Sequence, residues 1–327
     1  MNLKRRTAML KRLVLAIALV AATATAACAD TVKLGLQPWL GYGPLWVAKE
    51  KGFFEKNGVD VALTTFNWDQ DMTAALASDN LDVIAGATNG MISNFNRGVD
   101  QKGFLVMDVS FEADAVLAAK GIGSITDLKG KKVAFESGST SDLLINYALK
   151  QNGMTIADIE HVPMGASEAG LALIAGHVDA AVTYEPYIST ALTQDSNYKV
   201  IFTAAKKPGL ISDLLSGSSV WIKAHPKDVQ GLIRSWDDAI NFIRANPAEG
   251  GALIAKAVGS PMKEFEPAFK GVRLYNVAEN KEILKGDFQA TIQEIGEIMQ
   301  ATTPDKIKKL PAASDILALD ELNAVAK

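Results

Sequence analysis

The sequence predicts an α/β protein with two lobes, each built on a mainly parallel sheet flanked by helices. Three observations lead to this fold class. Short apolar runs typical of strands alternate with longer runs at helical spacing, which is the pattern of βαβ units. The alternation starts near residue 31 and restarts near residue 115. The chain also has 327 residues, more than a single hydrophobic core usually serves.

The first α/β unit is predicted from four apolar runs and the helical patterns between them. Strands are expected at 31–36, 59–64, 83–85 and 104–107, and helices at 45–56, 72–77 and 91–96. The helix at 45–56 is expected to end at Asn57-Gly58, because Gly readily takes the left-handed conformation found after a helix C-terminus.

The second unit repeats the pattern, and a largely helical tail follows it. Strands are expected at 115–119, 132–135, 159–163, 178–183, 200–202 and 220–222, and helices at 141–152, 167–176 and 226–245. The chain is expected to cross between lobes at Ser110–Asp114 and Leu215–Ser219. Residues 30–112 with 218–327 then form lobe 1, residues 113–217 form lobe 2, and the tail packs back on lobe 1.

The first 29 residues have the three parts of a secretory signal peptide. Met1–Arg12 holds five basic residues and no acid, Leu13–Ala22 is apolar, and small residues lead to Ala27-Cys28-Ala29. We therefore expect export to the periplasm after cleavage. Lipid anchoring through Cys28 is the less favoured alternative, because Thr25 lies where an attachment box usually has a larger aliphatic residue.

The remaining composition excludes several classes of protein. Removing the five basic residues of the leader takes the formal net charge from −4 to −9, which argues against nucleic acid as a partner. Cys28 is the only cysteine, so we expect no disulfide and no thiolate metal ligand after cleavage. The chain lacks a Walker phosphate loop and a nucleophile elbow. We therefore expect a monomer that is not an enzyme, with no catalytic residue, cofactor or metal.

A ligand is expected at the carboxyl ends of the strands, where loops lead into helices. Trp39 and Tyr42 lie in a glycine-rich loop after the first strand. They could wall a planar or cationic ligand or seal the loop onto the core. Asp114, at the first crossing, precedes an apolar strand. A carboxylate buried there needs a partner, which a cationic ligand would supply.

The other loops carry polar residues that suit either a ligand contact or a helix cap. The full set of candidate ligand-binding residues is Trp39, Tyr42, Trp68, Asp69, Thr88, Asn89, Asp108, Asp114, Glu136, Ser139, Thr140 and Glu185. The acids in this set could also be ordinary first-turn residues of helices.

An ordered set of short motifs indicates a family. The motifs are Gly41-Tyr42 with Pro44, Gly52-Phe53-Phe54, Gly58–Val61, Asp127–Ala134, Ser139–Leu144, Gly176–Ala180 and Tyr184–Tyr187. In this order they resemble the NitT/TauT group of ABC-transporter solute-binding proteins, whose members bind nitrate, taurine, other sulfonates or aminopyrimidines. The resemblance covers about Val32 to Trp221.

This resemblance implies a type II periplasmic-binding-protein fold with two crossovers and a ligand between the lobes. It also implies a membrane permease and an ATPase as partners. Asp114 matches the position where taurine-type binders place an acid for the ammonium group of the ligand. Ser139 and Thr140 match the loop that receives the acid group in sulfonate binders.

The sequence departs from the family in the charge of its ligand loops. They hold no Arg or Lys and several acids, which would repel a plain anion. We therefore expect a cationic or zwitterionic nitrogen compound, such as an amine, an amidine, an aminopyrimidine or a taurine-like molecule. The alternatives are an anionic sulfonate or nitrate, or another class of protein: a pyrimidine-synthase-like enzyme, whose cysteine-rich signature is missing, or a ligand-sensing domain.

Overall fold

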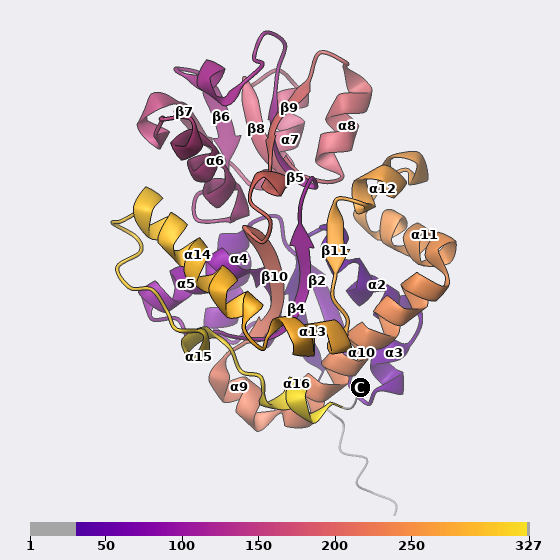
Figure 1. Ribbon diagram of the computed structural model, residues 1–327. Coiled ribbons are helices and arrows are strands. Elements are labelled where there is room, and N and C mark those ends of the chain that lie inside the picture. The colour runs from indigo at the N-terminus through magenta and orange to yellow at the C-terminus, as the bar shows by residue number, and fades with distance from the viewer. Residues whose placement is uncertain (1–30, 326–327) are drawn as a thin grey trace, which may run out of the picture. The chain divides into compact units, whose positions relative to one another are not determined.

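Two sheets with helices on their faces form the protein (Figure 1). The computed structural model describes residues 31–325, so the expected signal peptide and Cys28 lie outside the described residues. The predicted α/β class with two sheets is confirmed, and both sheets are mixed, because each contains parallel and antiparallel strand pairs. No helix in the described part of the chain is long and apolar enough to cross a membrane.

The larger sheet, which defines lobe 1, has six strands in the order β11-β4-β10-β3-β1-β2. These are β1 Val32–Leu36, β2 Val61–Thr65, β3 Val83–Ala87, β4 Lys102–Ser110, β10 Ile211–Gly217 and β11 Val272–Leu274. β1 pairs in parallel with β2 and β3, whereas β10 runs antiparallel between β3 and β4. β1, β3, β4 and β10 are almost entirely buried, as expected for strands covered on both faces.

The smaller sheet, which defines lobe 2, has the order β7-β6-β8-β5-β9. Its strands are β5 Asp114–Ala118, β6 Lys132–Phe135, β7 Glu160–Pro163, β8 Ala180–Tyr184 and β9 Lys199–Thr203. β6 pairs in parallel with β7 and β8, and β5 runs antiparallel between β8 and β9. β4 ends at Ser110 and β5 begins at Asp114, so the chain passes from the first sheet to the second between these residues.

Helices follow most of the strands. The loops that lead from each strand into the next helix lie at one edge of each sheet. Those of the α/β units are α2 Gly43–Glu50, α3 Phe53–Lys56, α4 Asp69–Ala77, α5 Thr88–Arg97, α6 Thr140–Gln151, α7 Ala166–Ile174 and α8 Tyr187–Gln194. The later helices are α9 Ser219–Ala224, α10 Pro226–Ala245, α11 Pro247–Val258, α12 Met262–Phe269, α13 Val277–Ile283, α14 Asp287–Thr302, α15 Ala313–Ile316 and α16 Asp320–Ala324.

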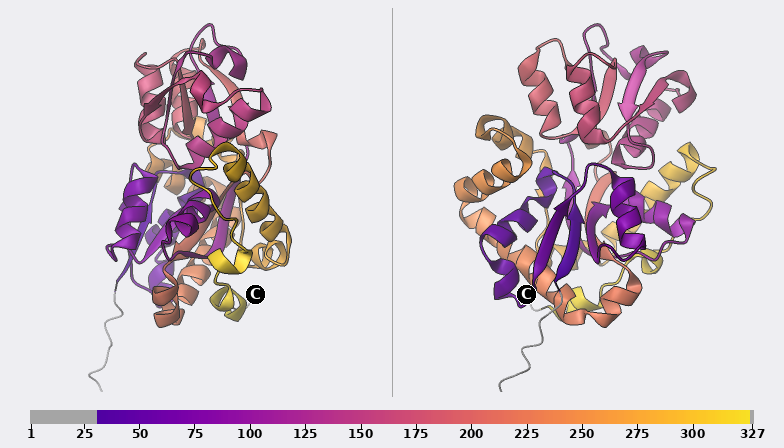
Figure 2. Two further views of the ribbon diagram at one scale, coloured as in Figure 1. Left: turned by 90° about the vertical axis from the view of Figure 1, so that its left-hand side faces the viewer. Right: turned by 180° about the vertical axis from the view of Figure 1, so that it is seen from behind.

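The tail packs against elements of lobe 1. α10 packs on α2 and α3, β11 pairs with β4, and α16 packs on α10. α14 contacts both α5 of lobe 1 and α6 of lobe 2, and its position beside these helices is visible in two orientations (Figures 1 and 2). The tail therefore touches both lobes.

Two predicted elements are wrong, each for a local reason, and two strands were missed. The helix at 45–56 is split into α2 and α3 by Gly52, which has a φ of +69°. Residues 220–222 lie in helix α9, because the Ser218 hydroxyl accepts a hydrogen bond from the Trp221 N–H at 3.1 Å and caps the helix. β10 and β11 were not predicted at all.

The missed strand β10 also moves the second crossing. Because β9 belongs to the second sheet and β10 to the first, the chain returns within residues 204–210, upstream of the expected Leu215–Ser219. β10 was missed because its sequence Ile-Ser-Asp-Leu-Leu-Ser-Gly is half polar, although all seven residues are buried.

Asn280 of α13 ties the tail to β4 and provides a test of the fold. Its side chain is fully buried, accepts from the Val106 N–H at 2.8 Å and donates to the Val106 carbonyl at 2.8 Å. Asn280→Ala leaves both backbone groups unpaired, so we expect the free energy of unfolding to fall by about 2–4 kcal/mol in urea titrations. The control Asn323→Ala, at an exposed position of α16, is expected to change it by less than about 0.5 kcal/mol. Equal effects would contradict this role.

Candidate ligand-binding site

Two carboxyl groups face each other where the lobes meet. Asp108 on β4 and Asp213 on β10 are directly opposite in the antiparallel register and are 0% and 3% exposed. Burial, and then the charge of Asp114, raise the pKa of Asp108 to about 7. Burial, and then the charge of Asp108, raise the pKa of Asp213 well above its usual range. A hydrogen bond between the two carboxyl groups lowers the pKa of Asp108 and raises that of Asp213. The pair therefore holds a proton, and a nearby cation would favour its release.

Trp39 contacts this pair from the loop after β1. Its indole Nε1–H donates to Asp108 Oδ1 at 3.2 Å, and its ring meets the ring of Tyr184 edge to face at 5.7 Å between centroids. Gly41 makes the contact possible, because a Cβ there would lie 2.3 Å from both Asp108 Oδ2 and Trp39 Nε1. The glycine in this loop is thus required by close packing.

Three more carboxyl groups surround the pair. Burial raises the pKa of Asp69 to about 6, that of Asp114 to about 7 and that of Glu136 to about 8. The charge of Asp69 adds to the upward shifts of Asp114 and Glu136. Among residues 31–325, none of the five carboxyl groups forms a salt bridge.

Buried polar atoms without hydrogen-bond partners gather at the same place. Within the described chain, the buried side-chain oxygens that lack a partner are Asn89 Oδ1, Asp108 Oδ2, Ser110 Oγ, Glu136 Oε2 and Tyr184 Oη. Asp108 and Ser110 belong to β4, Glu136 follows β6, Tyr184 ends β8, and Asn89 lies in the first turn of α5. Because buried polar groups are nearly always paired, their concentration here indicates a place prepared for a bound molecule.

Asp69, Asp114 and Asp213 border a small cavity of about 20 Å³, roughly the space of one water molecule. It is lined by aromatic, acidic and polar side chains from both lobes. They include Gln37, Trp39, Tyr42, Asp69, Asp114, Thr140, Tyr184 and Asp213. Burial, and then the charge of Asp213, raise the pKa of Tyr42 well above its usual range, so its hydroxyl stays protonated.

The lobes touch each other beside this cavity. The Gln70 N–H, in the first turn of α4, donates to Glu136 Oε1 of lobe 2 at 3.2 Å, and Gln70 Nε2 donates to the Ser137 carbonyl at 2.9 Å. These bonds hold the lobes together around the acids.

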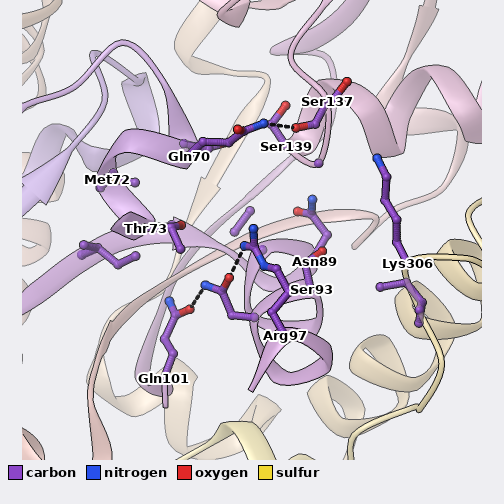
Figure 3. Close-up of a pocket in the computed structure, with 18 of the residues that line it drawn as sticks. Gln70, Met72, Thr73, Asn89, Ser93, Arg97, Gln101, Ser137, Ser139 and Lys306 are labelled. Atoms are coloured by element: carbon purple, nitrogen blue, oxygen red, sulfur yellow. Dashed lines mark hydrogen bonds between the residues drawn. The ribbon is translucent and has the colours of Figure 1, made fainter. Parts of the chain in front are cut away.

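A larger chamber of about 470 Å³ adjoins the small cavity (Figure 3). Asp69 and Ala87 line both spaces, so the two meet there. The chamber is bounded by α4, α5, the loop 137–139 of lobe 2 and the tail residues 305–307. It contains two basic side chains, Arg97 and Lys306, which the inspection of the loops had not placed near a ligand.

The candidates from the sequence separate into three groups. Trp39, Tyr42, Asp69, Asp114 and Thr140 line the small cavity, and Asp69, Asn89 and Ser139 line the chamber. Asp108 and Glu136 lie just behind these residues, through the bonds given above.

The third group is engaged elsewhere. The Thr88 hydroxyl pairs with the Ser212 carbonyl and hydroxyl at 3.0 and 2.8 Å, and Glu185 accepts from the Ser189 N–H and hydroxyl at 3.0 and 2.9 Å. Trp68 lies against Gly165 and lines neither space. Glu185 thus makes a local helix-start contact, whereas Thr88 ties the start of α5 to β10.

The sequence does not indicate Asp213, Tyr184 or Arg97 as ligand-binding residues, although the structure places all three at the candidate site. Asp213 lies within a strand that was not predicted. Tyr184 was read only as part of a family motif, although it ends a strand. Arg97 lies at the end of α5 rather than in a loop. It follows Asn89 by eight residues, and residues at multiples of four lie on the same face of a helix, so this spacing is a signal that could have placed both residues together.

Comparison with known proteins now identifies the family. Residues 40–250 match the family described as NMT1/THI5 like, so the chain belongs to that family, and the NitT/TauT resemblance is confirmed. A relative in Escherichia coli named "Putative aliphatic sulfonates-binding protein" is 33% identical over 158 residues, 46% of this chain and 47% of the relative. The chain thus spans about half the length of this relative. One of the same name in Bacillus subtilis is 26% identical over 79% of this chain and 80% of the relative.

Two further matches bear on fold and class. The alkanesulfonate-binding protein SsuA of Xanthomonas axonopodis pv. citri, solved with MOPS, superposes with a TM-score of 0.74 at 19% identity, over 89% of this chain and 99% of that one. This shows the periplasmic-binding-protein fold that the resemblance implied. A 4-amino-5-hydroxymethyl-2-methylpyrimidine phosphate synthase of Uromyces fabae is 27% identical over 68% of this chain and 70% of the enzyme.

The raised carboxyl pKa values predict an unusual pH dependence of stability. The folded protein holds these protons up to pH 6–8, whereas the unfolded chain releases them near pH 4. Their contribution is therefore fully present below about pH 4 and is lost as the pH rises through 6–8. We expect the ligand-free protein to be less stable at pH 8.5 than at pH 5.5, by about 2 kcal/mol or more.

Calorimetry at the two pH values measures this difference. Asp213→Asn should reduce it, because one member of the opposed pair no longer titrates, whereas Asp195→Asn at an exposed position should leave it unchanged. Greater stability at pH 8.5 would contradict the buried cluster.

Gly41→Ala tests the contact between Trp39 and Asp108. The added methyl group must displace one of them, so we expect a loss of about 1–3 kcal/mol in urea unfolding and a changed Trp fluorescence spectrum. Gly286→Ala is the control, since no atom lies within 4 Å of its added Cβ and its φ of 178° suits any residue. A Gly41 variant as stable as this control would show that the packing is loose.

Proposed function

We propose that this protein is the solute-binding component of an ABC importer, and that it captures a small zwitterion in the cleft between its lobes. The zwitterion carries a cationic nitrogen and a sulfonate or similar acid group. The family and the fold support the class of protein. The unpaired polar atoms at the junction of the lobes support the place of binding.

The buried carboxyl cluster carries the assignment of the cationic group. Asp69, Asp108, Asp114, Glu136 and Asp213 have no counter-ion among the described residues, and each has a raised pKa. An opposite charge within a few ångströms favours ionised carboxylates. A ligand cation would therefore supply the interaction that the chain itself lacks.

The aromatic rings at the small cavity suit the same group. Trp39, Tyr42 and Tyr184 line it together with Asp114 and Asp213. Indole and phenol faces attract cations, most strongly where water is excluded. The space holds about 20 Å³, so a larger solute must enter while the lobes are apart.

The acid group is supported by the relatives and by the start of α6. The two relatives named for aliphatic sulfonates and the SsuA structure share the family or the fold. In this chain, Ser139 and Thr140 line the two spaces at the N-terminus of α6, where backbone N–H groups attract anions. An aliphatic sulfonate without an amine is the second candidate, favoured by the names of these relatives.

The proposed class of solute-binding protein implies export of the chain and two membrane-associated partners. An N-terminal signal peptide would deliver the chain to the periplasm, and a permease with its ATPase would receive the solute. Contacts from both lobes to the solute would shift the population toward the closed form that a permease can recognise. A pyrimidine-synthase activity, suggested by the Uromyces relative, is the alternative of another class, and the cysteine-free chain after residue 29 disfavours it.

A matched pair of ligands tests the cationic group. Titration calorimetry with 2-aminoethanesulfonate and ethanesulfonate, which differ only in the ammonium group, should show at least about 100-fold tighter binding of the amine, or about 2.7 kcal/mol. Ethylamine and nitrate should bind more weakly than the zwitterion. Asp114→Asn should reduce the preference, and the exposed Asp195→Asn should keep it. Equal or tighter binding of ethanesulfonate would support the second candidate instead.

A further inference from the structure

We propose that one face of helix α5, formed by Asn89, Ser93 and Arg97, binds the acid group of the solute inside the large chamber. The cationic end of the same solute then lies beside Asp69, which lines both the chamber and the small cavity. This inference rests on the proposed function and adds to it the residues that select the acid group and the length of the molecule.

The spacing of the three residues places them in a row. They lie four residues apart in a regular helix, so their side chains project from the same side. All three line the chamber, and Figure 3 shows them on the chamber side of α5. An amide, a hydroxyl and a guanidinium in one row offer donors to the several oxygens of an acid group.

A chain of buried amides holds Arg97 from behind. Its guanidinium donates to Asn94 Oδ1. The Asn94 amide donates in turn to Gln101, whose Nε2 donates to the Ser216 hydroxyl at 2.8 Å. Asn94, Gln101 and Ser216 are all buried. The guanidinium is thus oriented while its remaining N–H groups stay open, which is the arrangement that bidentate recognition of an acid group needs.

Arg97 has no acidic partner in the described part of the chain, in contrast to Lys306 on the opposite wall. The Lys306 ammonium lies 3.8 Å from Asp142 Oδ2 and is already compensated. Acidic residues 69 and 305 also line the chamber, but neither forms a salt bridge with Arg97 within residues 31–325. Arg97 is therefore the basic group available to a ligand.

The unpaired side chain of Asn89 is a second observation, independent of Arg97, that indicates a ligand at this place. It is 3% exposed, and its side chain forms no hydrogen bond with any described residue, while Oδ1 is completely buried. A buried amide without partners is costly. An acid group cannot pair with Oδ1, because both only accept hydrogen bonds; the Asn89 Nδ2 group is the donor that this residue could offer to the acid group at the N-terminal end of the row.

The dimensions indicate an elongated solute. The chamber of about 470 Å³ lies in the range of pockets for drug-sized ligands, and the cavity at the carboxyls holds about 20 Å³. A solute that places its acid group on α5 and its cation beside Asp69 needs a spacer between the two charges. We expect this spacer to be longer than two carbon atoms.

A homologous series tests this arrangement on the full chain. Aminoalkanesulfonates with two to six carbon atoms are titrated into the wild type, Arg97→Gln, Arg97→Lys and the control Lys227→Gln, an exposed position of α10. Longer members should bind the wild type at least about 10-fold tighter than the two-carbon member. Arg97→Gln should weaken them by about 30-fold, and Arg97→Lys should restore part of the loss. Equal affinities of Arg97→Gln and Lys227→Gln would overturn the inference.

A second probe separates this inference from the proposed function. If no aminoalkanesulfonate binds the wild type, the proposed function fails, and ethanesulfonate alone then tests the α5 face. Nitrogen-15 NMR should show shifts at the Arg97 Nε–H and at the backbone N–H groups of Asn89 and Ser93, and Arg97→Gln should abolish the backbone shifts. No shift at these groups, or shifts that survive in the variant, would overturn the inference.

Discussion

The opposition of Asp108 and Asp213 across β4 and β10 is the constraint on which the rest of this site depends. Two acids at directly paired positions in a buried sheet repel each other when both are ionised. Burial penalises their charged forms further, and both pKa values rise. Trp39 offsets part of this cost through its bond to Asp108. In the proposed function, the cation of the solute would offset the rest of this cost.

The fold creates this pair through its second crossing. β10 enters the first sheet between β3 and β4 after the chain has built lobe 2, and it brings polar residues into a buried position. The hydroxyl groups of Ser212 and Ser216 form hydrogen bonds there with Thr88 and Gln101. Asp213 is left to face Asp108. The same strand therefore joins the lobes, places an acid at their junction and supports the amides behind Arg97.

The sequence predicted those parts of the site that local patterns determine. Trp39, Asp69 and Asp114 were found because loops after strands, with capping signals, are visible in a single sequence. Asp213 was not, because a half-polar strand has no hydrophobic pattern and is buried only by its neighbours in the sheet. Arg97 was missed because its role depends on which face of α5 the tail leaves open. The opposed charges and the chamber arise from tertiary contacts between segments more than 100 residues apart, such as those that join Thr88 to Ser212.

The cleft has acidic side chains at one end and the basic Arg97 at the other. A zwitterion would present the opposite charge to each end. This reconciles an acidic cleft with relatives named for sulfonates. The claim that a cation of the solute binds at the carboxyl cluster is tested most directly by counting the protons released when an aminoalkanesulfonate binds at pH 7. Calorimetry in buffers of different ionisation enthalpy gives this number. The account predicts release of about one proton or more, because the cation lowers the carboxyl pKa values. Binding without proton release, or with proton uptake, would contradict it.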